Sequence, residues 1–183
     1  MTLYGTGDGV RLERRFLLPA MPRALASGAA WLVEERYLAG TRLALRRAVS
    51  PMGPANGTGP QLTLGQRVRT ASGSTVRVTL VRRVRPDEYA ALLRLPSDVL
   101  VWRRYPVRLA GWPCSVDVFA GELSGLVLAQ AAFESVGQPA RFPTPVYAVA
   151  EVTGDGRFNE ERLARMSAST LARTVSEYGM LLR

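Results

Sequence analysis

The side chains that could do chemistry in this sequence are arginines that share one face of short segments with a two-residue period. Arg42 and Arg46 share one face of a segment whose other face carries Leu43 and Leu45. A two-residue repeat is typical of a β-strand, in which successive side chains point to opposite faces. Guanidinium groups are planar and permanently charged, and they bind phosphate through two hydrogen bonds at once. The spacing therefore predicts strands with an arginine face that attracts anions.

The net charge of the chain agrees with an anionic ligand. The 183 residues include 24 basic and 15 acidic ones, giving a formal charge of +9, and every basic residue is arginine. A positive surface raises the local concentration of phosphates, nucleic acid and acidic lipid without selecting among them. We therefore expect an anion-binding protein. The alternative is that much of this charge lies on solvated faces with no ligand.

Several kinds of site are excluded by residues that the sequence lacks. It contains no histidine, which rules out a Ser-His-Asp triad, a Cys-His pair and an imidazole-ligated metal. Cys114 is the only cysteine, so there is no internal disulfide, and we expect it to be a buried packing residue. Residues 1–10 do not resemble a targeting signal, and no stretch reaches membrane-spanning length. A cytoplasmic protein without membrane contact is expected.

Alternation of apolar and polar residues predicts a single, mainly β domain over residues 1–183. We expect about eight strands, at 10–16, 31–37, 41–47, 61–64, 75–84, 99–109, 115–119 and 126–133. A proline at the first position and two acids in the first turn predict a short helix over 86–93. The strands before residues 50–60 are too few to close a core of their own, which favours one domain.

Two segments interrupt this pattern. Residues 50–60 are rich in proline and glycine, which predicts a mobile hairpin loop; a linker between domains is the alternative. Residues 159–183 carry apolar residues at helical spacing behind an asparagine cap and two glutamates. They predict an amphipathic C-terminal helix, in one piece or broken once, that packs on the sheet or meets a partner.

Specific motifs are similar to those of a known family. The segments VDVFAGELSGL at 116–126 and EVTGDGRF at 151–158 resemble the late strands and the closing segment of bacterial CYTH proteins, the triphosphate tunnel family. LERRFL at 12–17, Tyr37-Leu38 and Arg104-Tyr105 lie in the same order, so the resemblance spans nearly the whole chain. It implies an α+β, mainly β fold, a closed antiparallel β-barrel of about eight strands forming a tunnel, with a few peripheral helices. In that family basic residues hold a triphosphate, and glutamates hold Mg²⁺ or Mn²⁺ for its hydrolysis.

This sequence departs from the family's metal site. The opening Glu-x-Glu-x-Lys motif corresponds to RLERR at 11–15, in which only Glu13 is acidic. The late Glu-x-Glu pair corresponds to Gln130 and Ala132, so both carboxylates are absent. Arg11 also puts a cation near the metal's position, where two unit charges 4 Å apart repel by about 4 kcal/mol in a protein-like dielectric. The resemblance therefore implies phosphate binding with hydrolysis impaired or lost, and no metal cofactor.

The resemblance also gives candidate residues. Arg15, Arg46 and Arg104 occupy positions that match basic residues of the family, and they are the first candidates for ligand contact. A second basic position is Ala44 here, for which Arg42 on the same face is a substitute. The further candidates are Arg11, Arg42, Arg77 and Arg82. If the protein is an enzyme, Glu13 is the catalytic candidate, and Glu13, Asp117 and Glu151, with Glu122, are the candidate ligands for Mg²⁺ or Mn²⁺.

Three functions stay open. The first is a tunnel protein that binds a phosphate-rich anion (triphosphate, nucleotide or polyphosphate) without turnover. The second is an active inorganic or nucleoside triphosphatase with an altered metal site. The third is a scaffold or regulatory module that binds no small ligand and meets a protein partner or a second copy of itself. Nucleic-acid binding is a further option, which the charge of +9 permits although no recognised reader motif is present.

Overall fold

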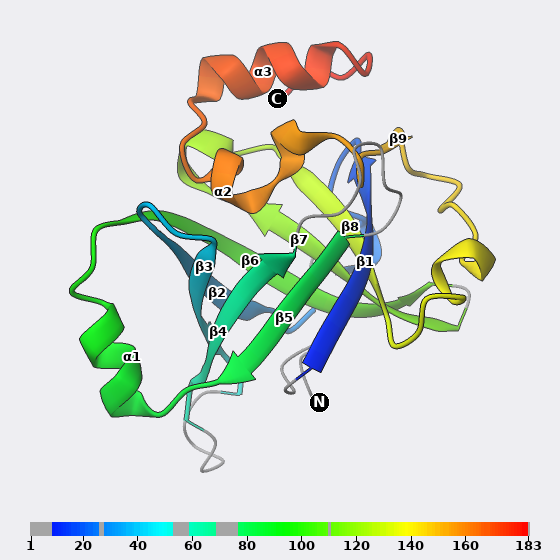
Figure 1. The fold of residues 1–183 in the computed structure, drawn as a ribbon. Coiled ribbons are helices and arrows are strands. Elements are labelled where there is room, and N and C mark those ends of the chain that lie inside the picture. Colours follow the sequence, from blue (N-terminus) through cyan, green and yellow to red (C-terminus); the bar gives the residue numbers. More distant parts are fainter. Residues whose placement is uncertain (1–8, 26–27, 53–58, 69–76, 110, 183) are drawn as a thin grey trace.

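The computed structural model describes residues 9–25, 28–52, 59–68, 77–109 and 111–182. This part of the chain forms nine strands and three α-helices (Figure 1). The strands are β1 (Gly9–Leu18), β2 (Trp31–Leu38), β3 (Leu43–Val49), β4 (Gln61–Val68), β5 (Arg77–Arg83), β6 (Ser97–Leu109), β7 (Trp112–Phe119), β8 (Val127–Phe133) and β9 (Ala150–Glu151). The helices are α1 (Pro86–Leu92), α2 (Glu160–Leu163) and α3 (Ala168–Ser176). The mainly β class with peripheral helices is confirmed.

The strands form one antiparallel sheet in the order β5-β4-β3-β2-β6-β7-β8-β1-β9. β1 pairs with β8 from Leu12 to Leu18 and with the short β9 at Phe16 and Leu17. The first residues of β1, Gly9 to Glu13, also pair with β5, the strand at the far end of the order. The long β1 therefore has hydrogen-bonded neighbours on both sides.

The two-residue period directs alternate side chains to opposite faces of the sheet, which in β2 leaves one face buried and the other partly exposed. In β2 the side chains of Trp31, Val33, Glu35 and Tyr37 are buried, while Leu32 is exposed. A strand with one buried face shows this alternation because successive Cβ atoms point to opposite sides of the sheet. Glu35 thus lies on the inner face among apolar residues, where a carboxylate needs a partner.

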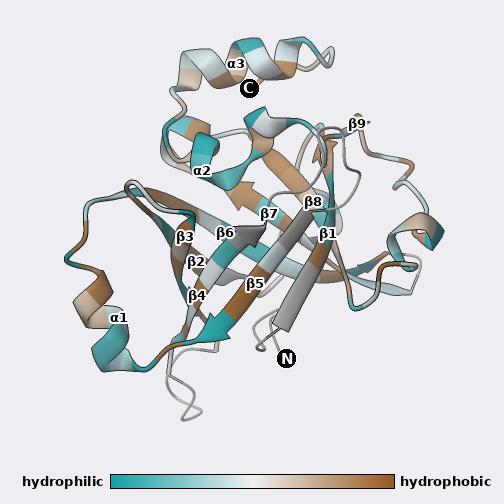
Figure 2. Ribbon diagram, viewed as in Figure 1, coloured by the Kyte–Doolittle hydropathy of each residue, from teal (hydrophilic) through white to brown (hydrophobic). Residues whose placement is uncertain are grey.

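The C-terminal segment forms two helices instead of one. α2 and α3 are separated at residues 164–167, and both lie over one end of the sheet, whereas α1 lies at another side (Figure 1). Both helices mix hydrophilic and hydrophobic residues (Figure 2). Leu171 and Val175 of α3 are fully buried in the cluster that contains Trp102 and Phe158. Of the alternatives that the sequence left open, the structure has this segment broken once and packed on the sheet.

Other predictions can be compared with the same structure. β3 and β4 pair as an antiparallel hairpin, so the segment 50–60 joins neighbouring strands, although its residues 53–58 lie outside the described part. Cys114 is buried, and burial raises the pKa of its thiol to about 11, in agreement with a packing role. Among the described residues, no helix has both the length and the apolar character needed to cross a bilayer.

Candidate functional site

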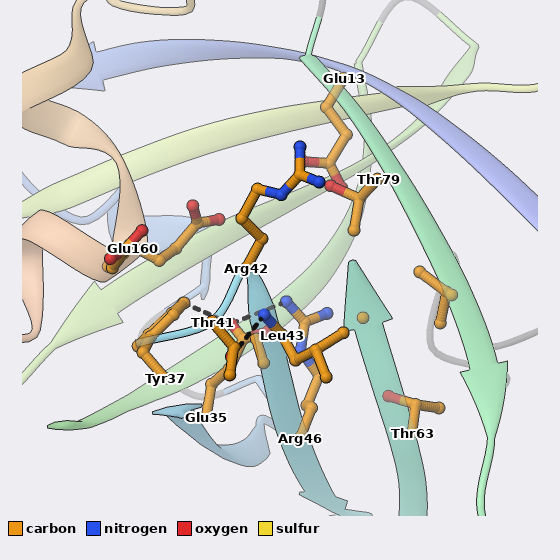
Figure 3. Close-up of a pocket in the computed structure, with 14 residues that line it drawn as sticks. Glu13, Glu35, Tyr37, Thr41, Arg42, Leu43, Arg46, Thr63, Thr79 and Glu160 are labelled. Carbon is orange, nitrogen blue, oxygen red and sulfur yellow. Dashed lines mark hydrogen bonds and ion pairs between the residues drawn. The ribbon is translucent and has the colours of Figure 1, made fainter. Parts of the chain in front are cut away.

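A cavity of about 240 Å³ lies between the strands β1 to β5 and the start of α2 (Figure 3). Side chains of both charges line it among the described residues. The acids are Glu13 of β1, Glu35 of β2, and Glu160 and Glu161 of α2; the bases are Arg46 of β3 and Arg42 just before it. Thr63 of β4 and Thr79 of β5 add hydroxyl groups. The lining can thus bind a polar, charged ligand.

Small residues create the space for this cavity. Ala44 of β3 and Gly65 of β4 are paired across the two strands, and both line the cavity. A Cβ atom on Gly65 would lie 3.5 Å from Cγ2 of Thr79, so a long side chain would fill the space beside it. Ala44 is the position that the CYTH resemblance matches to a second basic residue, and a small residue there leaves room for a ligand.

Arg46 is the deepest basic residue that lines the cavity. Its Nη2 donates a hydrogen bond to Oε2 of Glu35 at 3.0 Å, and the same oxygen accepts one from the Tyr37 hydroxyl at 2.8 Å. Its guanidinium lies 5.5 Å from the centre of the Trp102 ring. Burial opposes the charge, but the attraction and hydrogen bond of Glu35 outweigh it and raise the pKa of Arg46 above its ordinary value. Arg46 therefore stays charged.

Arg15 is held from several directions. It is 2% exposed and forms ion pairs with Glu160 and, at 3.7 Å, with Glu13. Its guanidinium also donates to the carbonyl oxygen of Phe158 at 3.3 Å and to Oε1 of Gln130 at 3.4 Å. Arg15 thus joins β1 to the C-terminal segment.

Arg104 completes the same cluster from β6. It donates two hydrogen bonds to the carboxylate of Asp117, at 2.7 and 2.6 Å, and a third at 2.9 Å to the Gln130 oxygen that Arg15 also contacts. Its guanidinium lies 5.6 Å from the centre of the Trp102 ring, which Arg46 also approaches. The structure therefore brings Arg15, Arg46 and Arg104, the first candidates for ligand contact, into one cluster, and of these three Arg46 lines the cavity.

The four further arginines have different outcomes. Arg42 lines the cavity at its exposed rim and forms no ion pair with another described residue. Arg82 is exposed, and its side chain points to the opposite face of β5 from those of Thr79 and Val81, which line the cavity. Arg82 therefore lies on the outer face, and its prediction as a cavity residue is wrong. The side chains of Arg11 and Arg77 are outside the described part of the structure.

The carboxylates predicted as metal ligands are not brought together. Glu151 accepts hydrogen bonds from Arg14 at 2.9 and 2.5 Å and from Thr153 at 2.8 Å. Burial opposes its charge, but these bonds and the charge of Arg14 lower the pKa of Glu151. Arg14 alternates with Glu13 along β1, so Glu151 lies away from the cavity. Glu122 instead accepts a hydrogen bond from the backbone N–H of Ala168, at the start of α3.

The described acids do not fit a divalent metal ion. Mg²⁺ needs several carboxylate or carbonyl oxygens directed at one position. Within the described ranges, no group of three or more His, Cys, Asp or Glu side chains is placed to do this. The acids of the cluster contact guanidinium groups instead, in the pairs Glu13–Arg15, Glu160–Arg15, Glu35–Arg46 and Asp117–Arg104.

Three residues of the cluster were not predicted. Glu35 lies two residues from both Val33 and Tyr37, so the alternation of side chains along the strand could have placed it on the inner face. Trp102 could have been found in the same way from β6. Glu160 had no such signal, because it follows the sheet in sequence and reaches the cavity through a turn and a short helix.

Comparisons with known proteins agree with this architecture. No protein-family model and no curated protein sequence matches the chain. Two structures of NE1496, one described as a hypothetical protein and one as an inorganic triphosphatase, match with TM-scores of 0.51 and 0.52 and sequence identities of 22% and 23%. The matches cover 86% and 87% of this chain and 99% and 97% of NE1496. HpAC1 from Hippeastrum, described as having a dominant triphosphatase activity, matches with a TM-score of 0.42 and 14% identity over 72% of this chain and 83% of its own. The likeness to NE1496 shows that this chain has the CYTH, or triphosphate tunnel, fold that its sequence motifs predicted.

Proposed function

We propose that this protein binds a phosphate-rich anion inside its sheet and does not hydrolyse it with a metal ion. Its main support is the buried cluster of Arg15, Arg46 and Arg104, in which each guanidinium is already held by carboxylates. NE1496, described as an inorganic triphosphatase, has the same fold, which supports a triphosphate, a nucleotide or a polyphosphate as the ligand.

The proposed binding path follows the inner faces of the strands. Pairing of β1 with β5 supports closure of strands β1 to β8 into a barrel whose interior is a tunnel. Arg42 at the rim is the first cation that an entering anion meets, and Arg46 lies deeper in the same cavity. Ala44 and Gly65 leave the space between them. Phosphate oxygens then replace carboxylate oxygens as acceptors from the guanidinium groups.

Binding without turnover follows from the charges of the site. Hydrolysis of a triphosphate needs a cation that bridges phosphate oxygens and stabilises the charge that develops at the breaking bond. Guanidinium groups can neutralise phosphate charge, but the acids that would position a divalent ion are directed at arginines. The pair that the family uses on β8 is Gln130 and Ala132 here. The site thus keeps the anion-binding half of the chemistry.

A triphosphatase assay combined with calorimetry tests this function. We expect inorganic triphosphate to bind with the same affinity in EDTA, Mg²⁺ or Mn²⁺, and phosphate release to stay at the buffer rate. An active triphosphatase would instead turn over at ordinary enzyme rates of about 1–10³ s⁻¹. Its activity would be lost in Glu13→Ala and kept in the exposed Glu134→Ala. Absence of binding to any triphosphate or polyphosphate at low salt would instead favour the scaffold function.

A further inference from the structure

The C-terminal segment contributes a charged wall to a cavity otherwise made by strands. α2 lies over one end of the sheet (Figure 1), and its first two residues, Glu160 and Glu161, line the cavity. Glu160 reaches into the group of lining residues in Figure 3. It is 7% exposed, whereas its neighbour is half-buried. A carboxylate buried to this extent needs a cationic partner.

That partner is Arg15, one of the three arginines of the proposed anion site. Glu160 forms an ion pair with its Nη2, and the carbonyl oxygen of Phe158 accepts a hydrogen bond from its Nη1 at 3.3 Å. Glu13 approaches the same guanidinium only at 3.7 Å. Glu160 therefore takes the place at Arg15 that a phosphate oxygen would need.

Glu160 differs from the other acids of the cluster in how it is held. Glu35 and Asp117 lie within strands that pair with neighbours on both sides, so the sheet fixes their backbone positions. Glu160 instead begins a helix of four residues between a turn at Gly156–Phe158 and the break at 164–167. When the Glu160 carboxylate leaves Arg15, every strand stays paired, but α2 loses the ion pair that holds its first residue to β1.

We propose that Glu160 is a built-in counter-ion that an incoming phosphate group displaces from Arg15, so that the site binds only anions that attract its arginines more strongly than this carboxylate does. The inference rests on the proposed function of the same site. A displaced carboxylate stays near the cavity and repels the ligand, so binding requires more attraction than Glu160 itself provides. Arg42 and Arg46 line the cavity, whereas Arg15 does not and is paired with Glu160, which does. Displacement of Glu160 would therefore give a triphosphate a third cation to contact, and Glu160 keeps Arg15 paired while no anion is bound.

Two neighbouring substitutions separate displacement from a simple change in net charge. Glu160→Gln and Glu161→Gln each remove one negative charge from the cavity wall, but only Glu160 contacts Arg15; Glu161 is paired with the exposed Arg165 at 3.7 Å. Calorimetry in EDTA at low salt gives the affinities for orthophosphate and for inorganic triphosphate. We expect Glu160→Gln to tighten orthophosphate binding by about tenfold, equal to about 1.4 kcal/mol, and triphosphate binding by at least as much, because the removed charge repels the more highly charged ligand more strongly. Glu161→Gln should change either affinity by less than about threefold.

The possible results distinguish this inference from the function on which it rests. If triphosphate binds but both substitutions change its affinity equally, or Glu160→Gln weakens binding, the counter-ion role is overturned. The anion site itself would still be supported by that result. No binding of either anion to any of the three proteins would overturn both. Hydrogen–deuterium exchange on the unmodified protein gives a second test that needs no variant. Triphosphate should speed exchange at residues 160–166, and unchanged or slower exchange there on binding would contradict displacement.

Discussion

Replacing Arg104 with alanine should lower the free energy of unfolding by about 3–5 kcal/mol, measured by urea denaturation. Arg104 and Asp117 are both buried, and their two hydrogen bonds of 2.7 and 2.6 Å join β6 to β7. Alanine leaves the Asp117 carboxylate inside the protein without its main counter-charge, which costs more than the loss of the contact itself. Gln130 also loses a donor to its side-chain oxygen.

Two further variants show whether the buried charge is the cause. Arg103→Ala alters the neighbouring, exposed position of β6 and should change stability by less than about 0.5 kcal/mol. An Arg104→Ala/Asp117→Ala double variant should be more stable than Arg104→Ala alone, because no unpaired acid remains at this position. If Arg104→Ala is no more destabilising than Arg103→Ala, the pair does not hold the interior together.

Replacing Arg46 with alanine should weaken binding of inorganic triphosphate by about 10–100-fold, since hydrogen bonds to charged groups contribute about 1.5–3 kcal/mol. Arg46 lines the cavity, is almost fully buried and stays charged, so its attraction is only weakly screened by solvent. Arg46→Lys keeps a charge but loses the planar fork that grips two oxygens. We expect its affinity to lie between those of the alanine variant and the unmodified protein, by calorimetry in EDTA.

Arg82→Ala is the matched control for this loss of binding. It removes the same charge from β5, but its side chain lies on the outer face, away from the cavity. Its triphosphate affinity should stay within about twofold of the unmodified protein at physiological ionic strength. Equal losses in the two variants would show that the anion is attracted by the overall charge of the surface and does not bind inside the sheet.

The course of the strands could be predicted from the sequence because a two-residue period directly reports a sheet with one buried face. β4 was predicted only to residue 64, where Gly65 follows the apolar run; pairing with β3 and β5 carries the strand to Val68. β9, with only Ala150 and Glu151, is too short to leave a periodic signal and exists because it pairs with β1. Arg82 was predicted on the wrong face of β5 because the alternation of side chains was not followed along that strand.

The candidate site was predictable in its arginines but not in its acids. Family positions identified Arg15, Arg46 and Arg104, and strand pairing brings all three into one cluster. The interior was expected to have exchanged carboxylates for guanidinium or neutral groups, and at Gln130 and Ala132 the sequence itself shows this. Acids nevertheless enter from Glu35 and Glu160, which no motif marks. The pairing of each acid with its arginine is decided by long-range packing, and the periodicity of the sequence carries no information about such packing.

Crystals grown with inorganic triphosphate and Mn²⁺ test most directly whether the arginine cluster binds an anion without a protein-held metal. The anomalous signal of manganese distinguishes that ion from water or sodium. We predict phosphate density within hydrogen-bonding distance of Arg46 and Arg15, with the Glu160 carboxylate turned away and no manganese coordinated by a protein side chain. An ordered manganese ion bound by Glu13 together with a second carboxylate would contradict this result and indicate a metal-dependent triphosphatase.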